Sequence, residues 1–288
     1  MRKSLFFVLA VLTSGLLAVP AGASQLTLWD GNAPAAAAAP TLFGQDDRQA
    51  VEETSLPPYS AVCKLLITYQ NGTSGEGTGF IYGENVLATA GHVLYDPSAG
   101  RGGTPAAIEI IPGADGENRP FGSYTAVPGE NSRFSVPARW RAQQDWRYDY
   151  GVLALDQAFP PEAGAFELGH YEDYAGDALQ GATLSILGYD AGSLRQLLAT
   201  GPVEQARRFD LLYQIGILPG QSGAPVVDKD NLVVAIQNYG VSLGSGGRCL
   251  PWNSGARLTK TAYCFLTERR DEALALQREG GPLEEGNG

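Results

Sequence analysis

Gly220-Gln221-Ser222-Gly223-Ala224-Pro225 is the stretch that most constrains this chain, because it sets a serine among glycines. A serine hydroxyl is nearly inert at neutral pH unless a base takes its proton during attack, so a reactive Ser222 needs a partner. The amides of Gly220 and Ser222 are placed to meet a developing oxyanion, since no side chain stands in the way. Gly223 and Pro225 then let the chain turn sharply into a following strand. The stretch therefore predicts a nucleophilic serine with an oxyanion-binding turn.

His92 is the predicted base for this serine. The chain has two histidines, and the other, His170, lies in a polar stretch that indicates an exposed loop. A base of this kind is held in the right tautomer by a buried carboxylate on its second ring nitrogen. Asp149 fits that task, because it stands just before residues 151–155, an apolar run that predicts a buried strand. The sequence thus predicts a triad of His92, Asp149 and Ser222.

Further segments extend the pattern beyond the triad. They are Gly44-Gln45-Asp46-Asp47-Arg48, Pro58-Tyr59-Ser60-Ala61-Val62, Gly77-Thr78-Gly79-Phe80 through Tyr95-Asp96, and Asn253-Ser254-Gly255-Ala256-Arg257-Leu258-Thr259. On these segments, the chain from about Thr41 to Arg270 resembles a glutamyl endopeptidase, from the secreted bacterial branch of the chymotrypsin-like serine proteases. The order His, Asp, Ser is the order of that class. The resemblance implies a serine endopeptidase that works through an acyl-enzyme.

The fold that this resemblance implies is all-β, a chymotrypsin-like double β-barrel over residues 41–270 with a C-terminal helix. Short apolar runs suit strands, and 37 glycines support many tight turns. The runs are Lys64 to Tyr69, Ala107 to Ile111, Thr183 to Leu187 and Leu232 to Gln237. Apolar and charged residues alternate in a helix-like way over residues 260–278. Residues 271–288 are therefore expected to hold the end of that helix and a frayed, acidic tail.

The pocket for the substrate residue before the scissile bond is assigned by the resemblance to Ile217 and Gln237. The family reads glutamate with a threonine at the first position and a histidine at the second. Ile217 cannot donate a hydrogen bond, and Gln237 is neutral. Burying a substrate carboxylate without strong donors is costly, so an apolar or neutral residue is expected. Gln237 leaves glutamine and glutamate open, whereas Gly216 offers no acid for a basic side chain.

Activation is expected to differ from that of trypsin-type zymogens. In those proteins a new N-terminus pairs with an aspartate directly before the serine, and here that residue is Gln221. The resemblance instead implies that the mature N-terminus, near Thr41 to Phe43, lies beside the substrate pocket. Its positive charge there would favour an acidic substrate.

Residues 1–23 are predicted to be a signal peptide. Arg2-Lys3 precedes an apolar run from Leu5 to Val19, and Ala21-Gly22-Ala23 suits cleavage before Ser24. The run is shorter than the roughly 20 apolar residues that a spanning helix needs. The following residues, to Pro40, lack a core-forming period and are interpreted as a pro-segment, with a short helical turn as the alternative for their alanine run. The mature protein is expected to be secreted and free of the membrane.

Composition narrows the class of partner. The formal net charge of the whole chain is −11, which argues against nucleic acid and anionic membrane surfaces. Proteins or peptides are the expected substrates, and the protein is expected to be a monomer without a cofactor. Two histidines and three scattered cysteines do not have the spacing of a zinc site.

The three cysteines allow at most one intramolecular bridge. Pairing of Cys249 with Cys264 is the first choice, and pairing of Cys63 with Cys249 is the alternative. Asn71-Gly72-Thr73 fits a glycosylation sequon, which matters only in a pathway that glycosylates.

Two other functions use the same features. A secreted, catalytically inactive binding protein on a protease scaffold is the alternative from another class, and the intact triad argues against it. An esterase shares the chemistry, but its usual nucleophile elbow has glycine two residues before and two after the serine. This chain has Ala224 at the second place.

Overall fold

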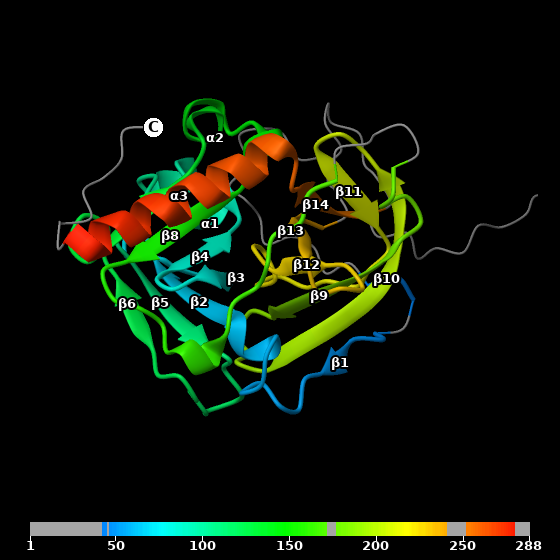
Figure 1. The fold of residues 1–288 in the computed structure, drawn as a ribbon, viewed down its shortest axis with the longest axis horizontal. Coiled ribbons are helices and arrows are strands. Elements are labelled where there is room, and N and C mark those ends of the chain that lie inside the picture. The colour runs from blue at the N-terminus through cyan, green and yellow to red at the C-terminus, as the bar shows by residue number, and fades with distance from the viewer. Residues whose placement is uncertain (1–41, 45, 172–176, 241–251, 280–288) are drawn as a thin grey trace, which may run out of the picture.

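The computed structural model describes residues 42–44, 46–171, 177–240 and 252–279. The predicted leader and pro-segment, residues 1–23 and 24–40, lie outside these ranges, and so does the tail after residue 279. The described residues form two antiparallel sheets of seven strands each, which curl into two barrels side by side (Figure 1). The predicted all-β double barrel is confirmed.

The N-terminal barrel has the strand order β6-β5-β2-β3-β4-β8-β7. Its strands are β2 (Val62–Thr68), β3 (Ser74–Gly83), β4 (Val86–Thr89), β5 (Ala107–Pro112), β6 (Tyr124–Ala126), β7 (Ser132–Ser135) and β8 (Gly151–Leu155). Leu65, Leu87 and Leu153 are fully buried in its core. β2 is buried along most of its length because it also contacts β9 of the second barrel.

The C-terminal barrel has the order β1-β10-β11-β14-β13-β12-β9 and closes because β10 also pairs with β9. Its strands are β1 (Gln49–Ala50), β9 (Thr183–Tyr189), β10 (Gln196–Ala206), β11 (Asp210–Tyr213), β12 (Pro225–Val227), β13 (Val233–Tyr239) and β14 (Asn253–Arg257). The first part of β10, to Pro202, pairs with β9, and the part from Val203 pairs with β11 after a bulge. The bulge bends the strand around the barrel.

Helices are few among the described residues. They are α1 (Gly91–Leu94), α2 (Ala138–Gln143) and α3 (Lys260–Glu279), with short 3-10 turns η1 (Tyr59–Ala61), η2 (Ser98–Gly100), η3 (Trp146–Tyr148) and η4 (Pro161–Ala163). The four predicted strand runs match β2, β5, β9 and β13 to within two residues, and the predicted helix matches α3. No helix of the described part is long and apolar enough to cross a membrane.

Each end of the described chain packs on the barrel formed by the opposite half. β1 pairs with Leu197 and Leu198 of β10, in the C-terminal barrel. α3 follows the last strand of that barrel yet lies across β8 and β4 of the N-terminal one (Figure 1). There the Tyr82 hydroxyl donates to the Leu266 carbonyl at 2.9 Å. The two barrels are thus tied together by both ends.

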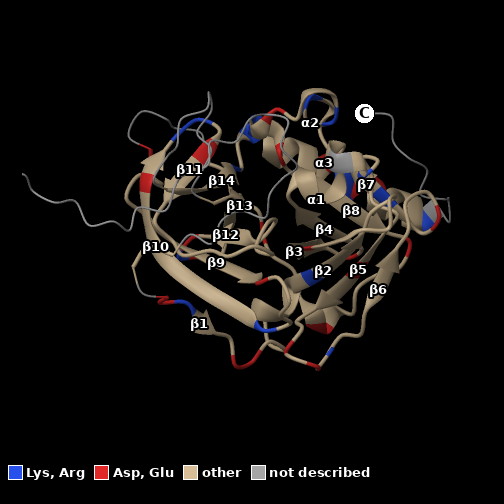
Figure 2. Ribbon diagram, turned by 180° about the vertical axis from the view of Figure 1, so that it is seen from behind, with Lys and Arg blue, Asp and Glu red and all other residues tan. Residues whose placement is uncertain are grey.

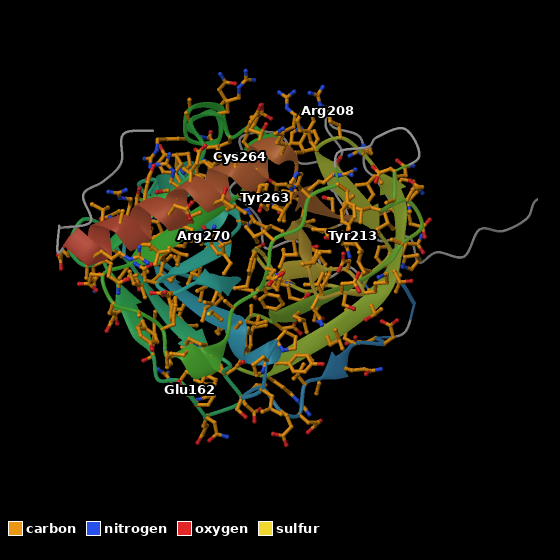
Figure 3. The ribbon with its side chains drawn as sticks, viewed as in Figure 1. Glu162, Arg208, Tyr213, Tyr263, Cys264 and Arg270 are labelled. Atoms are coloured by element: carbon orange, nitrogen blue, oxygen red, sulfur yellow. The ribbon has the colours of Figure 1, made fainter. Side chains whose placement is uncertain are left out.

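Both predicted cysteine pairings involve Cys249. Cys63 on β2 and Cys264 on α3 (Figure 3) are free thiols, and Cys249 lies outside the described residues. Burial raises the pKa of the Cys63 thiol well above its usual range.

Most charged residues lie on helices and loops rather than on strands (Figure 2).

Candidate active site

Neighbouring strands bring the predicted base and carboxylate together. β4 leads into α1, which carries His92, and Asp149 stands between η3 and β8. β4 pairs with β8 so that Thr89 is opposite Gly151, which sets the two side chains at the same end of the sheet. Ser222 comes from the other barrel, on the turn before β12. His92 and Asp149 therefore come from the N-terminal barrel and Ser222 from the C-terminal one, and the Thr78 N–H of β3 donates to the Ser222 carbonyl where the barrels join.

His92 and Asp149 form a doubly bonded pair. The ring atom Nδ1 of His92 lies 2.9 Å from Oδ2 of Asp149, and the backbone N–H of His92 donates to Oδ1 at 2.7 Å. The Asp149 side chain is fully buried, while that of His92 is 23% exposed. A Cβ on Gly91 would lie 2.9 Å from Asp149 Oδ1, which explains why a glycine precedes the histidine.

The electrostatics of this pair favour its charged forms. Burial alone lowers the pKa of His92, but the Asp149 carboxylate outweighs it and raises that pKa above the usual value. Burial alone raises the pKa of Asp149, yet the charge of His92 and hydrogen bonds from His92, Tyr239 and Asn238 lower it overall. An ionised Asp149 beside a neutral His92 is the arrangement that a general base needs.

Asn238 and Tyr239 contact the His92–Asp149 pair, although the sequence did not single out either residue. The Asn238 side-chain amide donates to the Asp149 carbonyl and accepts from the Ala256 N–H. The Tyr239 ring stacks on the His92 ring with centroids 5.9 Å apart, and its hydroxyl donates to the Asp149 carboxylate. Both follow Gln237 on β13, so the strand assigned to the pocket also supports the base.

The serine turn is attached to the N-terminal barrel through two threonines. The N–H of Thr78 donates to the Ser222 carbonyl, and its hydroxyl donates to the Gly220 carbonyl, both at 2.9 Å. The Thr89 hydroxyl donates to the Thr78 carbonyl at 2.7 Å. Gly223 fits against this corner, since a Cβ there would lie 2.9 Å from the Ala90 nitrogen. These contacts give a structural reason for both threonines, which lie within the segment from Gly77 to Asp96.

Two amide groups of the serine turn point to no protein acceptor. Among the hydrogen bonds of the described residues, the N–H groups of Gly220 and Ser222 donate to none, whereas those of Gln221 and Gly223 do. Gly220 has φ +99°, and a Cβ there would lie 2.7 Å from the Tyr189 carbonyl oxygen. A glycine is therefore required, and both amides are available to a substrate oxygen.

The Ser222 hydroxyl has a long hydrogen bond to the Asn238 carbonyl, at 3.5 Å, rather than one to the His92 ring. Hydrogen bonds between a nucleophile and its base are often long before substrate binds and shorten in the reactive complex. The arrangement can therefore support proton transfer from Ser222 to His92.

Ile217 and Gln237 lie in the C-terminal barrel beside the serine turn. Ile217 is buried in the apolar core, and Gln237 is 1% exposed. The backbone of Gln237 bonds both Gly223 and Ala224. Its side-chain oxygen accepts from the Tyr213 hydroxyl (Tyr213 is labelled in Figure 3), and its side-chain nitrogen donates to the Tyr239 carbonyl at 3.2 Å. The amide is thus already engaged at both ends. Residues 241–251, which follow this strand, lie outside the described part.

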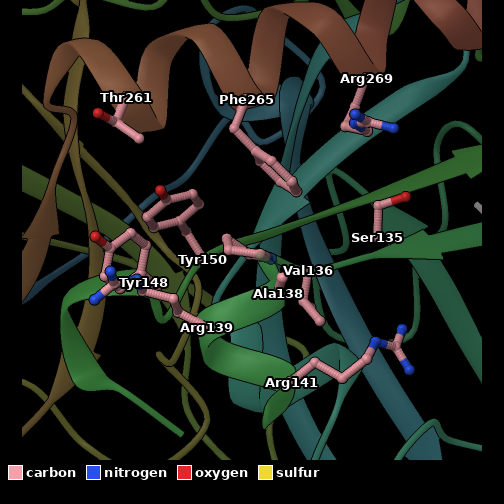
Figure 4. Close-up of a pocket in the computed structure, with 11 residues that line it drawn as sticks. Ser135, Val136, Ala138, Arg139, Arg141, Tyr148, Tyr150, Thr261, Phe265 and Arg269 are labelled. Carbon is pink, nitrogen blue, oxygen red and sulfur yellow. The ribbon is translucent and has the colours of Figure 1, made fainter. Parts of the chain in front are cut away.

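A separate pocket of about 270 Å³ lies between the start of α2, η3 and α3 (Figure 4). Tyr148 and Tyr150 line it, on either side of Asp149 in the sequence, together with Phe265 and arginines such as Arg139 and Arg269. None of the predicted catalytic or pocket residues lines it. It is therefore distinct from the candidate active site.

Comparison with known proteins gives one consistent picture. A family model described as a trypsin-like peptidase domain matches residues 77–236. The chain is 30% identical to the glutamyl endopeptidase of Bacillus licheniformis over 81% of this chain and 70% of the relative. It is 27% identical to a Bacillus subtilis protein named extracellular metalloprotease, over 77% of this chain and 67% of that one. A solved Glu endopeptidase structure superposes with TM-score 0.67 and 23% identity, over 80% of this chain and 99% of that chain, which shows a shared fold.

The name of the Bacillus subtilis relative implies a metal ion. Over the residues that the structure describes, no group of three or more histidine, cysteine, aspartate or glutamate side chains is arranged to hold one. His92 and Asp149 are instead bonded to each other. The described side chains thus do not fit the metal that this name implies.

Proposed function

The chain belongs to the trypsin-like serine peptidases and is an endopeptidase, and on that premise we propose that His92, Asp149 and Ser222 form its catalytic triad. Ser222 Oγ attacks the peptide carbonyl while His92 Nε2 takes its proton, and Asp149 stabilises the resulting imidazolium. The amides of Gly220 and Ser222 bind the oxyanion. His92 then protonates the leaving amine, and water hydrolyses the acyl-enzyme.

One observation carries this proposal. A buried carboxylate holds the His92 ring at 2.9 Å. Asn238 links that carboxylate residue to Ser222, whose turn presents two backbone N–H groups without an acceptor among the described residues. This combination provides a base, an orienting group, a nucleophile and oxyanion donors in one place. A binding protein needs none of them.

Replacement of the nucleophile tests the proposal. Ser222→Ala is expected to lower kcat by about 10⁶-fold, as loss of a triad serine does. The matched control is Ser185→Ala, on β9, whose hydroxyl bonds Thr200 at 3.0 Å in the C-terminal barrel. An organophosphonate probe should label the wild type and Ser185→Ala, but not Ser222→Ala. Near-full activity in Ser222→Ala would falsify the assignment, and an unlabelled wild type would favour an inactive binding protein.

We also propose that the enzyme prefers an apolar or neutral residue before the scissile bond. Ile217 brings no donor, and the Gln237 amide is engaged with Tyr213 and with the backbone, so a substrate carboxylate would lack strong partners. The experiment is a cleavage-site profile on a diverse peptide library, with Ser222→Ala as the blank. Cleavage mainly after glutamate would contradict this preference and point to the charge of the mature N-terminus.

Export and processing complete the proposal. Residues 1–23 are proposed to direct secretion and residues 24–40 to be removed afterwards, leaving a monomeric mature enzyme that begins near Thr41. The composition of the leader supports this, as does the name of the extracellular Bacillus subtilis relative. N-terminal sequencing of the secreted protein checks both cleavage sites, and light scattering checks the monomer.

A further inference from the structure

Asp190, in the loop after β9, accepts hydrogen bonds from two distant parts of the chain. Arg48 Nη1 donates to both carboxylate oxygens, at 2.8 and 2.9 Å. The side-chain amide of Gln221 donates to Oδ1 at 3.0 Å. The Arg48 side chain is only 4% exposed, and its other donors bond Asp46. Asp190 thus connects the segment before β1 to the residue directly before Ser222.

The same loop is held on its other side by a buried lysine. Lys64 Nζ donates to the Asp190 carbonyl at 2.8 Å and lies 2.6 Å from Glu76 Oε2. Glu76 in turn accepts from the Gly192 N–H at 2.8 Å. Lys64 is fully buried, and a charge removed from water needs such partners. The loop 190–192 is therefore fixed from both barrels.

This loop directly supports the turn that carries the oxyanion donors. The Ala191 N–H donates to the Pro219 carbonyl at 2.6 Å, which orients the peptide leading into Gly220. Gly220 packs so closely against the loop that a Cβ on it would lie 2.7 Å from the Asp190 carbonyl carbon. A shift of the loop would therefore move the Gly220 amide.

We infer that Arg48 and Asp190 are positioning residues that hold the turn 219–222 in its oxyanion-binding geometry. In trypsin-type enzymes the residue before the serine is itself the anion. Here that residue is Gln221, which is neutral and buried. Its side-chain amide donates to the Asp190 carboxylate, and Asp190 forms the ion pair with the Arg48 guanidinium. Arg48 is an internal side chain, so this ion pair needs no free α-amino group. The inference rests on the proposed function, since it assigns these residues to the oxyanion turn of that site.

Variants of Asp190, Arg48 and Gln221 test the inference when their loss of kcat is compared with their loss of stability. Asp190→Asn, Arg48→Gln and Gln221→Ala are expected to lower kcat about 10²-fold, the loss that follows removal of one oxyanion donor, with a smaller change in KM. The matched control is Asp210→Asn, which breaks the Arg207–Asp210 ion pair at the start of β11 in the C-terminal barrel and has no bond to the loop 190–192 or the turn 219–222 among the described residues. Its kcat should stay within twofold at a comparable change in Tm.

Two further readouts separate positioning from a merely structural role. A peptide aldehyde, whose adduct carries an oxyanion, should bind the three variants about 10²-fold more weakly, whereas a non-cleavable peptide of the same sequence should bind as it does to the wild type. Added guanidinium ion at millimolar concentration should restore part of the kcat of Arg48→Ala but not of Asp190→Asn. Arg48→Lys, which keeps the charge, guards against loss of folding and should fall between the wild type and Arg48→Gln.

The outcomes distinguish this inference from the proposed function. Phosphonate labelling of the wild type at Ser222 establishes the nucleophile, and its absence would remove the proposed function itself. With labelling present, equal kcat and equal aldehyde affinity in Asp190→Asn and in the wild type would overturn this inference alone. Parallel losses of aldehyde and non-cleavable peptide affinity would also overturn it, because they would show a collapsed substrate cleft.

Discussion

At the scale of single residues, His92 and Asp149 define how activity depends on pH. The pKa of His92 is raised above its usual 6.5, where burial alone would lower it, because Asp149 stays ionised beside it. The base must be neutral to accept a proton, so kcat/KM should rise with pH and reach half its maximum above pH 6.5. Asp149→Asn removes the anion that raises the His92 pKa, so only burial remains, and burial lowers that pKa.

For Asp149→Asn we therefore expect a half-maximum below that of the wild type and a kcat lower by about 10⁴-fold. Profiles of kcat/KM against pH for the two proteins provide the check. A half-maximum at the same pH in both would show that another group sets the acid limb.

Tyr239 supports the carboxylate and not only the ring above it. Tyr239→Phe keeps the stacking on His92 but loses the hydroxyl that donates to Asp149. A hydrogen bond to a charged group contributes about 1.5–3 kcal/mol, so kcat should fall roughly ten- to a hundredfold. Tyr171→Phe is the control, because that hydroxyl donates to Asp228 at 2.7 Å, another carboxylate. Equal kcat values for the two variants would remove Tyr239 from the site.

The sequence predicted which residues meet at the site, but not everything that surrounds them. His92, Asp149 and Ser222 stood in short motifs whose chemistry is recognisable. The structure bonds His92 to Asp149, and it links Ser222 to Asn238, which also bonds Asp149. Tyr239 was not predicted at the site, because regular strand alternation would put it on the same face as Gln237 and not beside His92. A register shift between these two residues re-aims the tyrosine towards His92, and no pattern in the sequence marks that bulge.

At the scale of elements, the serine turn depends on glycines for two different reasons, conformation and space. Gly220 has φ +99° and backbone atoms within 2.7 Å of its Cβ position, whereas Gly181 has φ +73° and nothing within 4 Å. Gly220→Ala should therefore displace the turn and lower kcat at least 10²-fold. Gly181→Ala should cost about 1–2 kcal/mol of stability and leave kcat unchanged.

Steady-state kinetics and urea denaturation of the two glycine variants check this prediction. Similar kcat values in both would show that the turn tolerates a side chain. The comparison is informative because both glycines have a positive φ, which strains an alanine in their place, and they differ mainly in their surroundings.

Local sequence patterns predicted single strands and helices better than they predicted the strand pairing that closes the C-terminal barrel. Apolar runs located β2, β5, β9 and β13, and the charge alternation located α3. β1 has only two residues and exists because β10 offers it an edge, so nothing local marks it. The bend of β10 between β9 and β11 depends on pairing with strands far away in the sequence. Such long-range pairing cannot be derived from propensity alone.

At the scale of the whole molecule, α3 connects the two halves, because it follows the second barrel in the sequence and packs on the first. Leu266 is fully buried where α3 meets the N-terminal barrel, and Leu266→Ala should lower the free energy of unfolding by about 2–5 kcal/mol. Leu56→Ala is the control, since Leu56 is 56% exposed and should change stability by less than about 0.5 kcal/mol. Urea denaturation measures both. A small effect of Leu266→Ala would mean that α3 is only loosely attached.

The crossing of the two ends has a consequence for the order of events during synthesis. α3 is the last described element to be made, yet it covers β4 and β8, the strands that lead into His92 and out of Asp149. A growing chain therefore cannot cover its first barrel with α3 until residues 260–279 have left the ribosome. The serine turn arrives late as well, from the second barrel. A protease built in this order receives its proposed nucleophile and the cover of its base only after its first barrel has been translated.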